Sequence, residues 1–313
     1  MRFTAASFLW VRLLVSIAPA PAAQAVSVIR VPQDAATIQA AVDRAQPGDI
    51  VLVSPGVYRE AVLIQKSYIS LIADVPADPL FRAPEERVIL DGENTRERII
   101  RVRGASIDNP VRGLVIRGFL VRRFKDRGIS LERVQESLVE LNEAREGAPM
   151  PDFSAGIWLS DSSFNSVVGN YMHDNTMFGL GISASHFNVV RGNLVLRIGN
   201  GEREPAGCGI SMWGSRGNLI LQNWFEFGVW GIWIQEDDTP SVANLIQQNT
   251  IRSHTRTGIW ISEPNNGNFI LQNDVTGNGM LWLPPTGRYD IFDDPPMNNI
   301  WQGNRAYAPF TPY

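Results

Sequence analysis

Residues 156–170 read GIWLSDSSFNSVVGN, and residues 209–223 read GISMWGSRGNLILQN. Both stretches open with Gly-Ile-x-apolar and close with two asparagines five residues apart. The opening phrase begins at seven places, the last with Asp instead of Gly: Gly128, Gly156, Gly181, Gly209, Gly231, Gly258 and Asp290. The gaps between these starts are 28, 25, 28, 22, 27 and 32 residues. A repeat of this length is typical of a solenoid in which each repeat forms one coil.

The paired asparagines run in step with this phrase. The pairs are Asn165/Asn170, Asn188/Asn193, Asn218/Asn223, Asn244/Asn249, Asn268/Asn273 and Asn299/Asn304, and Asn142 extends the second column by one coil. A stacked Asn can bond the backbone of its own turn and the amide of the next coil, as in an amyloid Asn ladder. The second column is therefore expected to be a buried ladder along the solenoid.

Short apolar runs separated by turn residues indicate strands rather than helices. Three such strands in each coil of 22–32 residues predict a parallel β-helix of about ten coils. Side chains alternate across a strand, so the Ile after each Gly is expected to face the interior. These Ile residues would stack with a step of about 4.8 Å, the spacing between neighbouring strands.

The N-terminal residues divide into two segments. Residues 1–25 resemble a secretory signal peptide, with Arg2, an apolar run and a small-x-small cleavage site at Ala23-Gln24-Ala25. Residues 26–56 predict a cap made of one helix, with Asp34 at its N-terminus, and one strand at Ile50–Val53. The cap would cover the first coil of a β-helix that spans residues 57–313.

Composition limits the partners of the chain. The net charge of −4 argues against nucleic acid as a partner. A single cysteine, Cys208, excludes an internal disulfide, and it is expected to point into the core as a small apolar residue. After cleavage of the signal peptide no stretch is apolar enough to span a bilayer, so the mature protein is expected to be periplasmic or extracellular without stable membrane insertion.

These motifs carry a resemblance. Thr37-Ile38-Gln39, Gly56-Val57-Tyr58-Arg59-Glu60 and the Gly-Ile-x-apolar coils with paired Asn resemble the pectin-lyase-like superfamily of exported right-handed parallel β-helix proteins. The resemblance covers nearly all of the mature chain and implies the fold. It does not fix an activity, since the fold hosts pectate lyases, polygalacturonases, pectin methylesterases, alginate epimerases and a periplasmic protein for copper-enzyme maturation.

The catalytic signatures of these families do not transfer. Gly56–Glu60 matches pectin methylesterases, but their catalytic Asp motifs have no counterpart. Polygalacturonases carry several catalytic motifs, and this chain has only two isolated Asp-Asp pairs, Asp237-Asp238 and Asp293-Asp294. Met172-His173-Asp174 lacks the Asp-Pro of the alginate epimerase motif Asp-Pro-His-Asp.

In this superfamily the outer face of the Gly-Ile strand is the usual substrate groove. The expected outward residues are, in coil order, Ser130, Trp158, Ser183, Ser211, Trp233, Trp260 and Phe292. The row Trp158, Trp233, Trp260 and Phe292 suits the stacking of pyranose rings, although such residues also simply cover a sheet. The segment 279–289, with Trp282 and Tyr289, would wall one side.

The position five residues after each Gly supplies a candidate catalytic set. Arg133, Asp161 and His186 would occupy three successive coils. His186 would act as general base and Asp161 would orient it. The resemblance implies lyase or epimerase chemistry, in which Arg133 would neutralise a uronate carboxylate. The alternative is an ordinary ladder of surface charges.

Two further sets come second. Tyr171, His173 and Arg145 are residues of the lyase type on the face that follows the Asn column. Glu236, Asp237 and Glu263 form an acidic cluster that would suit Ca²⁺, or that is only a solubilising turn. The three histidines, His173, His186 and His254, are expected on different faces and so cannot share a metal.

The sequence therefore predicts an exported β-helix that binds a polysaccharide, with modification of lyase or epimerase type as an added activity. The alternatives are a non-catalytic envelope or adhesion protein and, third, a periplasmic metal-delivery factor.

Overall fold

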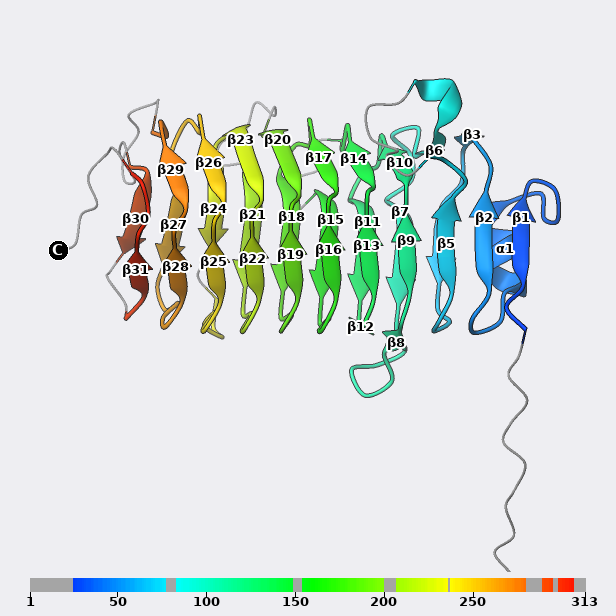
Figure 1. Cartoon of the computed structure of the whole chain (residues 1–313), viewed down its shortest axis with the longest axis horizontal. Helices are drawn as coiled ribbons and strands as arrows, with labels where there is room; N and C mark the ends of the chain where they lie inside the picture. Colours follow the sequence, from blue (N-terminus) through cyan, green and yellow to red (C-terminus); the bar gives the residue numbers. More distant parts are fainter. Residues whose placement is uncertain are drawn as a thin grey trace, which may run out of the picture.

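The computed structural model describes residues 25–76, 83–148, 154–199, 207–235, 237–279, 289–294 and 298–306. The predicted signal peptide lies almost wholly outside these residues. The chain winds into a right-handed parallel β-helix, as predicted, with three long parallel sheets that run the length of the molecule (Figure 1). No helix among the described residues is long and apolar enough to cross a membrane.

The first sheet, sheet A, has eleven strands, and in the coils with paired asparagines each strand lies between the two Asn residues. Its strands are β1 (Val28–Val31), β2 (Ile50–Val53), β5 (Ser70–Ala73), β9 (Val115–Arg117), β13 (Leu138–Glu140), β16 (Ser166–Val168), β19 (Val189–Arg191), β22 (Leu219–Leu221), β25 (Leu245–Gln247), β28 (Phe269–Leu271) and β31 (Ile300–Gln302). Every pair of neighbours is parallel, so each strand marks one coil.

Sheet B follows the turn that holds the second Asn of each pair. Its strands are β3 (Gly56–Tyr58), β6 (Val88–Asp91), β10 (Phe119–Arg122), β14 (Glu143–Arg145), β17 (Tyr171–His173), β20 (Leu194–Ile198), β23 (Trp224–Gly228), β26 (Thr250–Arg252) and β29 (Asp274–Thr276). A short 3-10 helix, η1 (Pro84–Glu86), precedes β6.

Sheet C contains the strands with the Gly-Ile phrase and two earlier strands without it. They are β4 (Val62–Ile64), β7 (Arg98–Arg103), β11 (Arg127–Glu132), β15 (Ala155–Ser160), β18 (Phe178–Ser183), β21 (Cys208–Trp213), β24 (Trp230–Ile234), β27 (Ile259–Ser262) and β30 (Ile291–Asp294). A small pair, β8 (Val111–Arg112) and β12 (Val134–Gln135), lies beside the main sheets.

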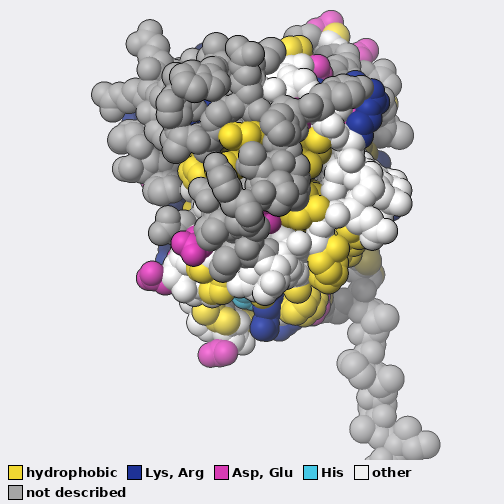
Figure 2. All heavy atoms as spheres, turned by 90° about the vertical axis from the view of Figure 1, so that its left-hand side faces the viewer, with side chains coloured by type: hydrophobic (Ala, Val, Ile, Leu, Met, Phe, Trp, Pro, Cys, Tyr) yellow, Lys and Arg dark blue, Asp and Glu magenta, His cyan; other side chains and the backbone are white. Residues whose placement is uncertain are grey.

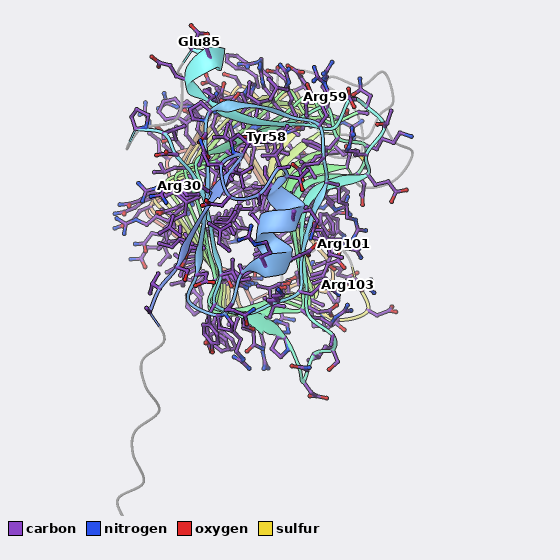
Figure 3. The ribbon with its side chains drawn as sticks, turned by 90° about the vertical axis from the view of Figure 1, so that its right-hand side faces the viewer. Arg30, Tyr58, Arg59, Glu85, Arg101 and Arg103 are labelled. Atoms are coloured by element: carbon purple, nitrogen blue, oxygen red, sulfur yellow. The ribbon has the colours of Figure 1, made fainter. Side chains whose placement is uncertain are left out.

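Helix α1 (Ile38–Arg44) lies at the N-terminal end of the coil, between the sheets (Figure 3). Its buried side chains Ile38, Ala41 and Val42 belong to the main core. The hydroxyl of Thr37, not Asp34 as predicted, caps the helix by accepting a bond from the Ala40 amide at 3.1 Å. Asp34 instead accepts from the Arg30 amide.

The Gly-x-Tyr-x-Glu segment serves this cap. The carboxylate of Glu60 accepts bonds from the amides of Ile38 and Gln39, both at 3.0 Å. Both amides belong to the first turn of the helix, where free N–H groups favour an anionic partner. The segment thus ties the helix to the first coils. Strand β1 was not predicted, and it adds a coil of sheet A beneath the helix.

The interior holds the predicted apolar column, except that Leu180 takes the place predicted for Ile182 in the third coil. Ile129, Ile157, Leu180, Ile210, Ile232, Ile259 and Ile291 are all at most 3% exposed. Each buried aliphatic side chain of this kind contributes about 1.5–3 kcal/mol relative to an exposed one. Repeated over the coils, this burial is the main favourable term that holds the sheets together.

Both asparagine columns form ladders, as predicted for the second of them. Asn170 Nδ2 donates to Asn193 Oδ1 at 3.1 Å and to the carbonyl of Val139 at 2.9 Å, while its Oδ1 accepts from the amide of Asn142 at 3.0 Å. A serine ladder lies at the other turn: the amides of Ser162, Ser185 and Ser215 donate to the hydroxyls of Ser185, Ser215 and Ser241. These ladders satisfy backbone groups that the turns would otherwise bury unpaired.

Candidate functional site

The outward side chains of sheet C form the face on which the candidate groove was expected. The central outward row is, in coil order, Arg101, Ser130, Trp158, Gly181, Ser211, Trp233, Trp260 and Phe292. Trp158, Trp233, Trp260 and Phe292 therefore share one row as predicted. The row differs from the prediction at the third coil, where Gly181 stands and Ser183 does not.

This difference is a register error of two residues. Leu180 pairs with Ile157 and with Ile210, so Gly179, not Gly181, occupies the column of Gly156 and Gly209. The sequence holds the signal for the correct register in its asparagines. Asn165 and Asn188 lie 23 residues apart, which places the start of the third coil at Gly179.

The corrected register separates the predicted catalytic set. Arg133 and Asp161 both lie in turns with positive φ (55° and 49°), and the third member of that column is Ala184 (φ 45°). His186 lies two residues farther on, beside Ser163. Among the described residues no hydrogen bond or ion pair joins Asp161 to His186, so the arrangement of orienting acid and base does not form.

The members of the set have other partners. Arg133 Nε donates to the carbonyl of Gly104 at 2.9 Å. His186 Nδ1 accepts from the amide of Arg216 at 3.3 Å. Burial and the nearby Arg216 charge lower the pKa of His186, and the weaker attraction of Asp161 only partly offsets them. The lowered pKa favours the neutral imidazole, and the bond from Arg216 holds it in the turn.

Trp158 lies over the backbone of Gly181. A Cβ on Gly181 would come within 2.0 Å of the indole, so only glycine fits beneath this ring. Trp158 contacts Trp213 at a centroid distance of 5.4 Å and Phe178 at 6.1 Å, and the Arg127 guanidinium lies 4.0 Å from its ring centroid. This geometry is a cation–π contact in a half-buried site.

The C-terminal aromatics form a second group. The rings of Trp233 and Trp260 are nearly parallel (6°), with centroids 4.5 Å apart. They therefore stack on each other along the solenoid axis and present mainly their edges to the outside. Phe292 lies 6.4 Å from Trp260 and stacks on Tyr289 at 5.1 Å. Trp282 of the predicted wall lies outside the described residues.

A cleft opens beside these two tryptophans. It has a volume of about 940 Å³ and is lined by Trp233, Gln235, Asp237, Asp238, Trp260, Ser262, Glu263 and Pro264. The Trp233 Nε1 donates to the Ser262 hydroxyl at 3.3 Å. The structure thus brings two of the predicted substrate-binding residues together with two of the predicted metal-binding residues, Asp237 and Glu263. Glu236 lies outside the described residues.

The other end of the same face is basic, which the sequence analysis missed. Glu132 binds Arg98 and Arg101, with Arg101 Nη2 at 2.8 Å, and Arg103 lies 3.6 Å away. Burial acts to raise the pKa of Glu132, but these arginines outweigh it and hold that pKa below its ordinary value. Arg101 and Arg103 project outward from the coil in Figure 3. The alternation Arg98-x-x-Arg101-x-Arg103 within one strand was the available signal.

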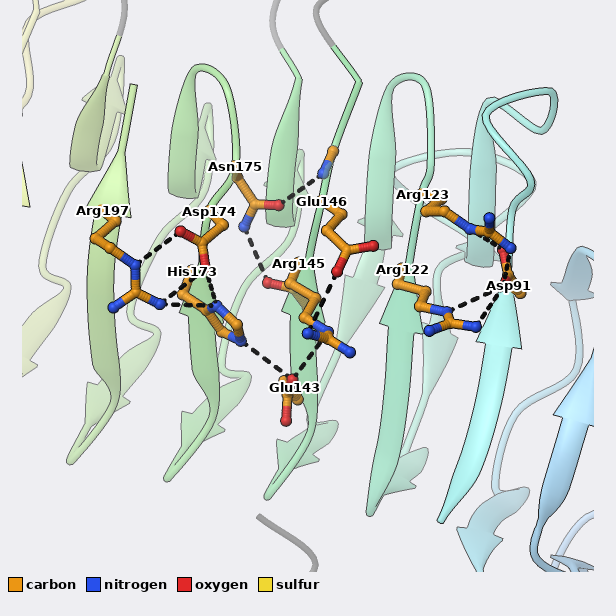
Figure 4. A network of polar contacts seen from close by, with 12 residues as sticks. Asp91, Arg122, Arg123, Glu143, Arg145, Glu146, His173, Asp174, Asn175 and Arg197 are labelled. Carbon is orange, nitrogen blue, oxygen red and sulfur yellow. Dashed lines mark hydrogen bonds and ion pairs between the residues drawn. The ribbon is translucent and has the colours of Figure 1, made fainter. Parts of the chain in front are cut away.

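The second-choice residues do come together, on the outer face of sheet B (Figure 4). Tyr171 and His173 stack with ring centroids 4.0 Å apart. His173 lies between two carboxylates, with Nε2 3.1 Å from Glu143 and Nδ1 2.5 Å from Asp174. Arg145 Nε lies 3.3 Å from Glu143.

This sheet B network is largely buried. Glu143 and Arg87 pair at 2.5 Å with side chains only 6% and 5% exposed. Burial acts to raise the pKa of Glu143, but His173 and Arg87 lower it below its ordinary value. With His173 and Tyr171 also under 9% exposed, the imidazole is mostly shielded from solvent.

Cys208 was wrongly predicted to face the core. It is buried in a separate cluster on the outer side of sheet C, with Ala155, Phe178, Val229 and Trp230. Its thiol donates to the carbonyl of Ile210 at 2.7 Å, and burial raises its pKa well above the ordinary value. The thiol therefore stays protonated and is not available as a thiolate ligand.

Several solved structures share this fold. An enzymatically active tailspike domain of bacteriophage CBA120 is 12% identical with a TM-score of 0.63, covering 86% of this chain and 40% of its own length. A mutant of the periplasmic alginate epimerase AlgG is 14% identical with a TM-score of 0.54, covering 83% of this chain and 63% of its own. An alginate lyase from a Paenibacillus species is 14% identical with a TM-score of 0.50, covering 90% and 95%.

At these identities the likeness shows the fold alone, and the chain spans less than two thirds of the first two structures. No curated protein matches the sequence. A model of the family described as periplasmic copper-binding protein (NosD) matches residues 115–281, which is more than half of the chain. The chain therefore belongs to the NosD family of periplasmic β-helix proteins and is an exported protein, periplasmic or extracellular.

Proposed function

We propose that the outer face of sheet C binds an extended polysaccharide. The observation that carries this proposal is the cleft of about 940 Å³ where Trp233 and Trp260 lie beside Asp237, Ser262 and Glu263. Aromatic rings next to a few polar groups are typical of sites for amphipathic ligands. Carboxylates accept hydrogen bonds from pairs of sugar hydroxyls, and ring edges contact the apolar faces of sugars.

The geometry favours hydroxyl recognition over simple stacking at this end. Because Trp233 and Trp260 cover each other's faces, a pyranose ring can contact their edges but cannot lie flat on both. The carboxylates of Asp237, Asp238 and Glu263 would repel a uronate there. Neutral sugar units therefore fit this cleft best, and acidic units would fit the end that carries Arg101 and Arg103.

The similar solved structures include an alginate epimerase and an alginate lyase, which agrees with a polysaccharide partner. Catalysis is a separate proposal with less support. Arg133 and Asp161 share a turn position that His186 does not, and the His173 set is buried. We expect His186→Ala to leave any turnover of alginate or pectin unchanged, as measured by the ultraviolet absorbance of unsaturated uronates. A loss of turnover would restore His186 as a base.

Copper handling is a second candidate, favoured by the family description. The described residues do not fit a resident copper site. No group of three or more His, Cys, Asp or Glu side chains among them could hold a metal ion. His254 is buried beside Asn278 and burial lowers its pKa to about 4, while the Cys208 thiol is protonated. Metal analysis of the purified protein after copper loading tests this candidate, and stoichiometric copper would support it.

The test of polysaccharide binding is a glycan panel with variants of the cleft. Trp260→Ala and Asp237→Asn should each weaken binding by about tenfold, the loss expected when one good contact is removed. Trp224→Ala is the control, because Trp224 is a tryptophan with 41% of its surface exposed that lies on sheet B. Equal effects of Trp224→Ala and Trp260→Ala, or no binding by the wild type to any glycan, would contradict the proposal.

A further inference from the structure

The outer face of sheet A carries an apolar stripe along the whole solenoid. Its first outward column is Val28, Ile50, Ser70, Val115, Leu138, Ser166, Val189, Leu219, Leu245, Phe269 and Ile300. Nine of these eleven residues are apolar, and all eleven are partly or fully exposed. The sugar-binding proposal does not use this face.

The turn before sheet A widens the stripe. Phe164 and Phe187, two residues ahead of the first column, are 56% and 45% exposed, and their rings stack at 5.3 Å. Exposed aromatic side chains that continue an aliphatic row are expensive in water unless another surface covers them. Such a row on a monomer therefore marks an interaction surface.

The stripe is large enough for a stable interface. Eleven strands spaced about 4.8 Å apart make it about 50 Å long. Two outward columns about 7 Å apart give a width of about 14 Å, and hence about 700 Å² per molecule. Two such surfaces together bury about 1,400 Å², within the range of specific protein–protein interfaces.

The second outward column supplies the charge pattern. In coil order it reads Arg30, Leu52, Ile72, Arg117, Glu140, Val168, Arg191, Leu221, Gln247, Leu271 and Gln302. Val168 on β16 is the middle of the eleven. Glu140 lies one coil before it and Arg191 one coil after it, so these two central charges have opposite signs at equal distances from the centre. Glu140 also pairs with Arg117 of its own chain at 3.3 Å.

We propose that sheet A is the interface between two antiparallel copies of this chain, related by a two-fold axis along β16. This symmetry places a coil that lies a given number of steps before β16 opposite the partner's coil that lies the same number of steps after β16. Glu140 of each copy then faces Arg191 of the other, and Phe164 of one copy meets Phe164 of the other at the axis. Leu138 faces Val189, and Val115 faces Leu219. The centre of the surface is self-complementary, as a two-fold interface requires, while farther out Arg117 faces Leu221.

Charge-swap variants test this register by sedimentation velocity on the mature chain. Glu140→Arg and Arg191→Glu should each raise the dimer dissociation constant by about tenfold or more, because each places like charges opposite one another twice. The double variant should recover most of the lost affinity, and the remainder reflects the Glu140–Arg117 ion pair that it lacks. Phe164→Lys should abolish the dimer, while Ile107→Lys, a change at an exposed aliphatic residue off sheet A, should not.

Circular dichroism and thermal unfolding of each variant establish that it is folded before its mass is compared. A wild-type chain that is monomeric up to its solubility limit overturns the proposal, as does a dimer that Phe164→Lys leaves intact. Failure of the double variant to recover excludes the antiparallel register. A monomer that co-sediments with phospholipid vesicles through the same residues would show instead that the stripe is a membrane contact.

Discussion

At the scale of single residues, Trp158 and Gly181 act as a pair across two coils. The indole fills the space that Gly181 leaves in the outward row, and this lets it reach Trp213. Gly181→Ala should therefore destabilise the protein by about 1–3 kcal/mol through overpacking, measured by urea unfolding. Trp158→Ala in the same chain should remove most of this penalty. Additive losses in the double variant would show that the two sites are independent.

The same pair explains the register error in the sequence-based prediction. Gly179-Leu180-Gly181-Ile182 and Gly181-Ile182-Ser183-Ala184 both fit the Gly-apolar-x-apolar phrase. A shift of two residues keeps every side chain on its own face, so alternation cannot detect it. The Asn spacing could have resolved it. The basic end around Arg98 was not recognised because its strand lacks the Gly that marks the others.

Asp91 gives a residue-scale prediction of pH dependence. Its side chain is 1% exposed, and burial acts to raise its pKa, but hydrogen bonds from Arg123, Arg122 and the Glu93 amide lower the pKa to about 2. A carboxyl with a lowered folded-state pKa stabilises the protein above its unfolded pKa near 4, and this stability is lost as pH falls from 4 to 2.

The loss should be about 2 kcal/mol between these pH values, because one pKa unit corresponds to about 1.4 kcal/mol. Unfolding free energies measured by urea titration at several pH values check it. Asp91→Asn should flatten the acid limb of the curve, and an unchanged acid limb in this variant would contradict the assignment.

At the scale of elements, the asparagine ladder links each turn to the next. Asn223 accepts bonds from the amide and the Nδ2 of Asn193, both at 2.9 Å, and donates to Val190 and to Asn249. Asn223→Leu would leave buried donors and an acceptor unpaired, at a cost of about 1–3 kcal/mol for each group. We expect a loss of several kcal/mol by thermal and urea unfolding.

Gln222→Ala is the control for this change, since Gln222 is the exposed neighbour in the same turn and also bonds its successor coil, Gln248, at 3.2 Å. Its removal should cost less than about 1 kcal/mol, because water replaces an exposed bond. Equal losses of unfolding free energy in the two variants would show that the buried Asn bonds stabilise the protein no more than the exposed Gln222–Gln248 bond does.

At the scale of the whole molecule, repetition made the fold predictable and the site much less so. Six coils repeat the two asparagines, and most of them repeat the buried Ile, so each copy supports the same interpretation. The outward residues do not repeat: Ser130, Trp158, Gly181 and Ser211 follow one another in a single row. A groove built from unlike residues depends on exact register and on loops, which no repeat encodes.

Stability should also vary along the solenoid, since each coil contacts only its neighbours. Hydrogen exchange followed by mass spectrometry should find the slowest amides in β16, β19 and β22, and faster exchange toward β31 at the C-terminal end. The N-terminal coils should exchange more slowly than the C-terminal ones, because α1 covers them. Uniform protection along the chain would mean that the molecule opens only as a single unit.

The ladders carry a consequence for how such a protein can change in evolution. Each ladder Asn accepts a bond at its Oδ1 from the amide of the Asn one coil earlier, by the same atoms at every step. A duplication or loss of one complete coil of 22–32 residues would therefore rejoin the ladder without a mismatch and change the length by about 4.8 Å. An insertion of any other size has to leave the coil as a loop. Descendants of this chain can lengthen or shorten in whole steps, and new binding surfaces can arise at the loops between them.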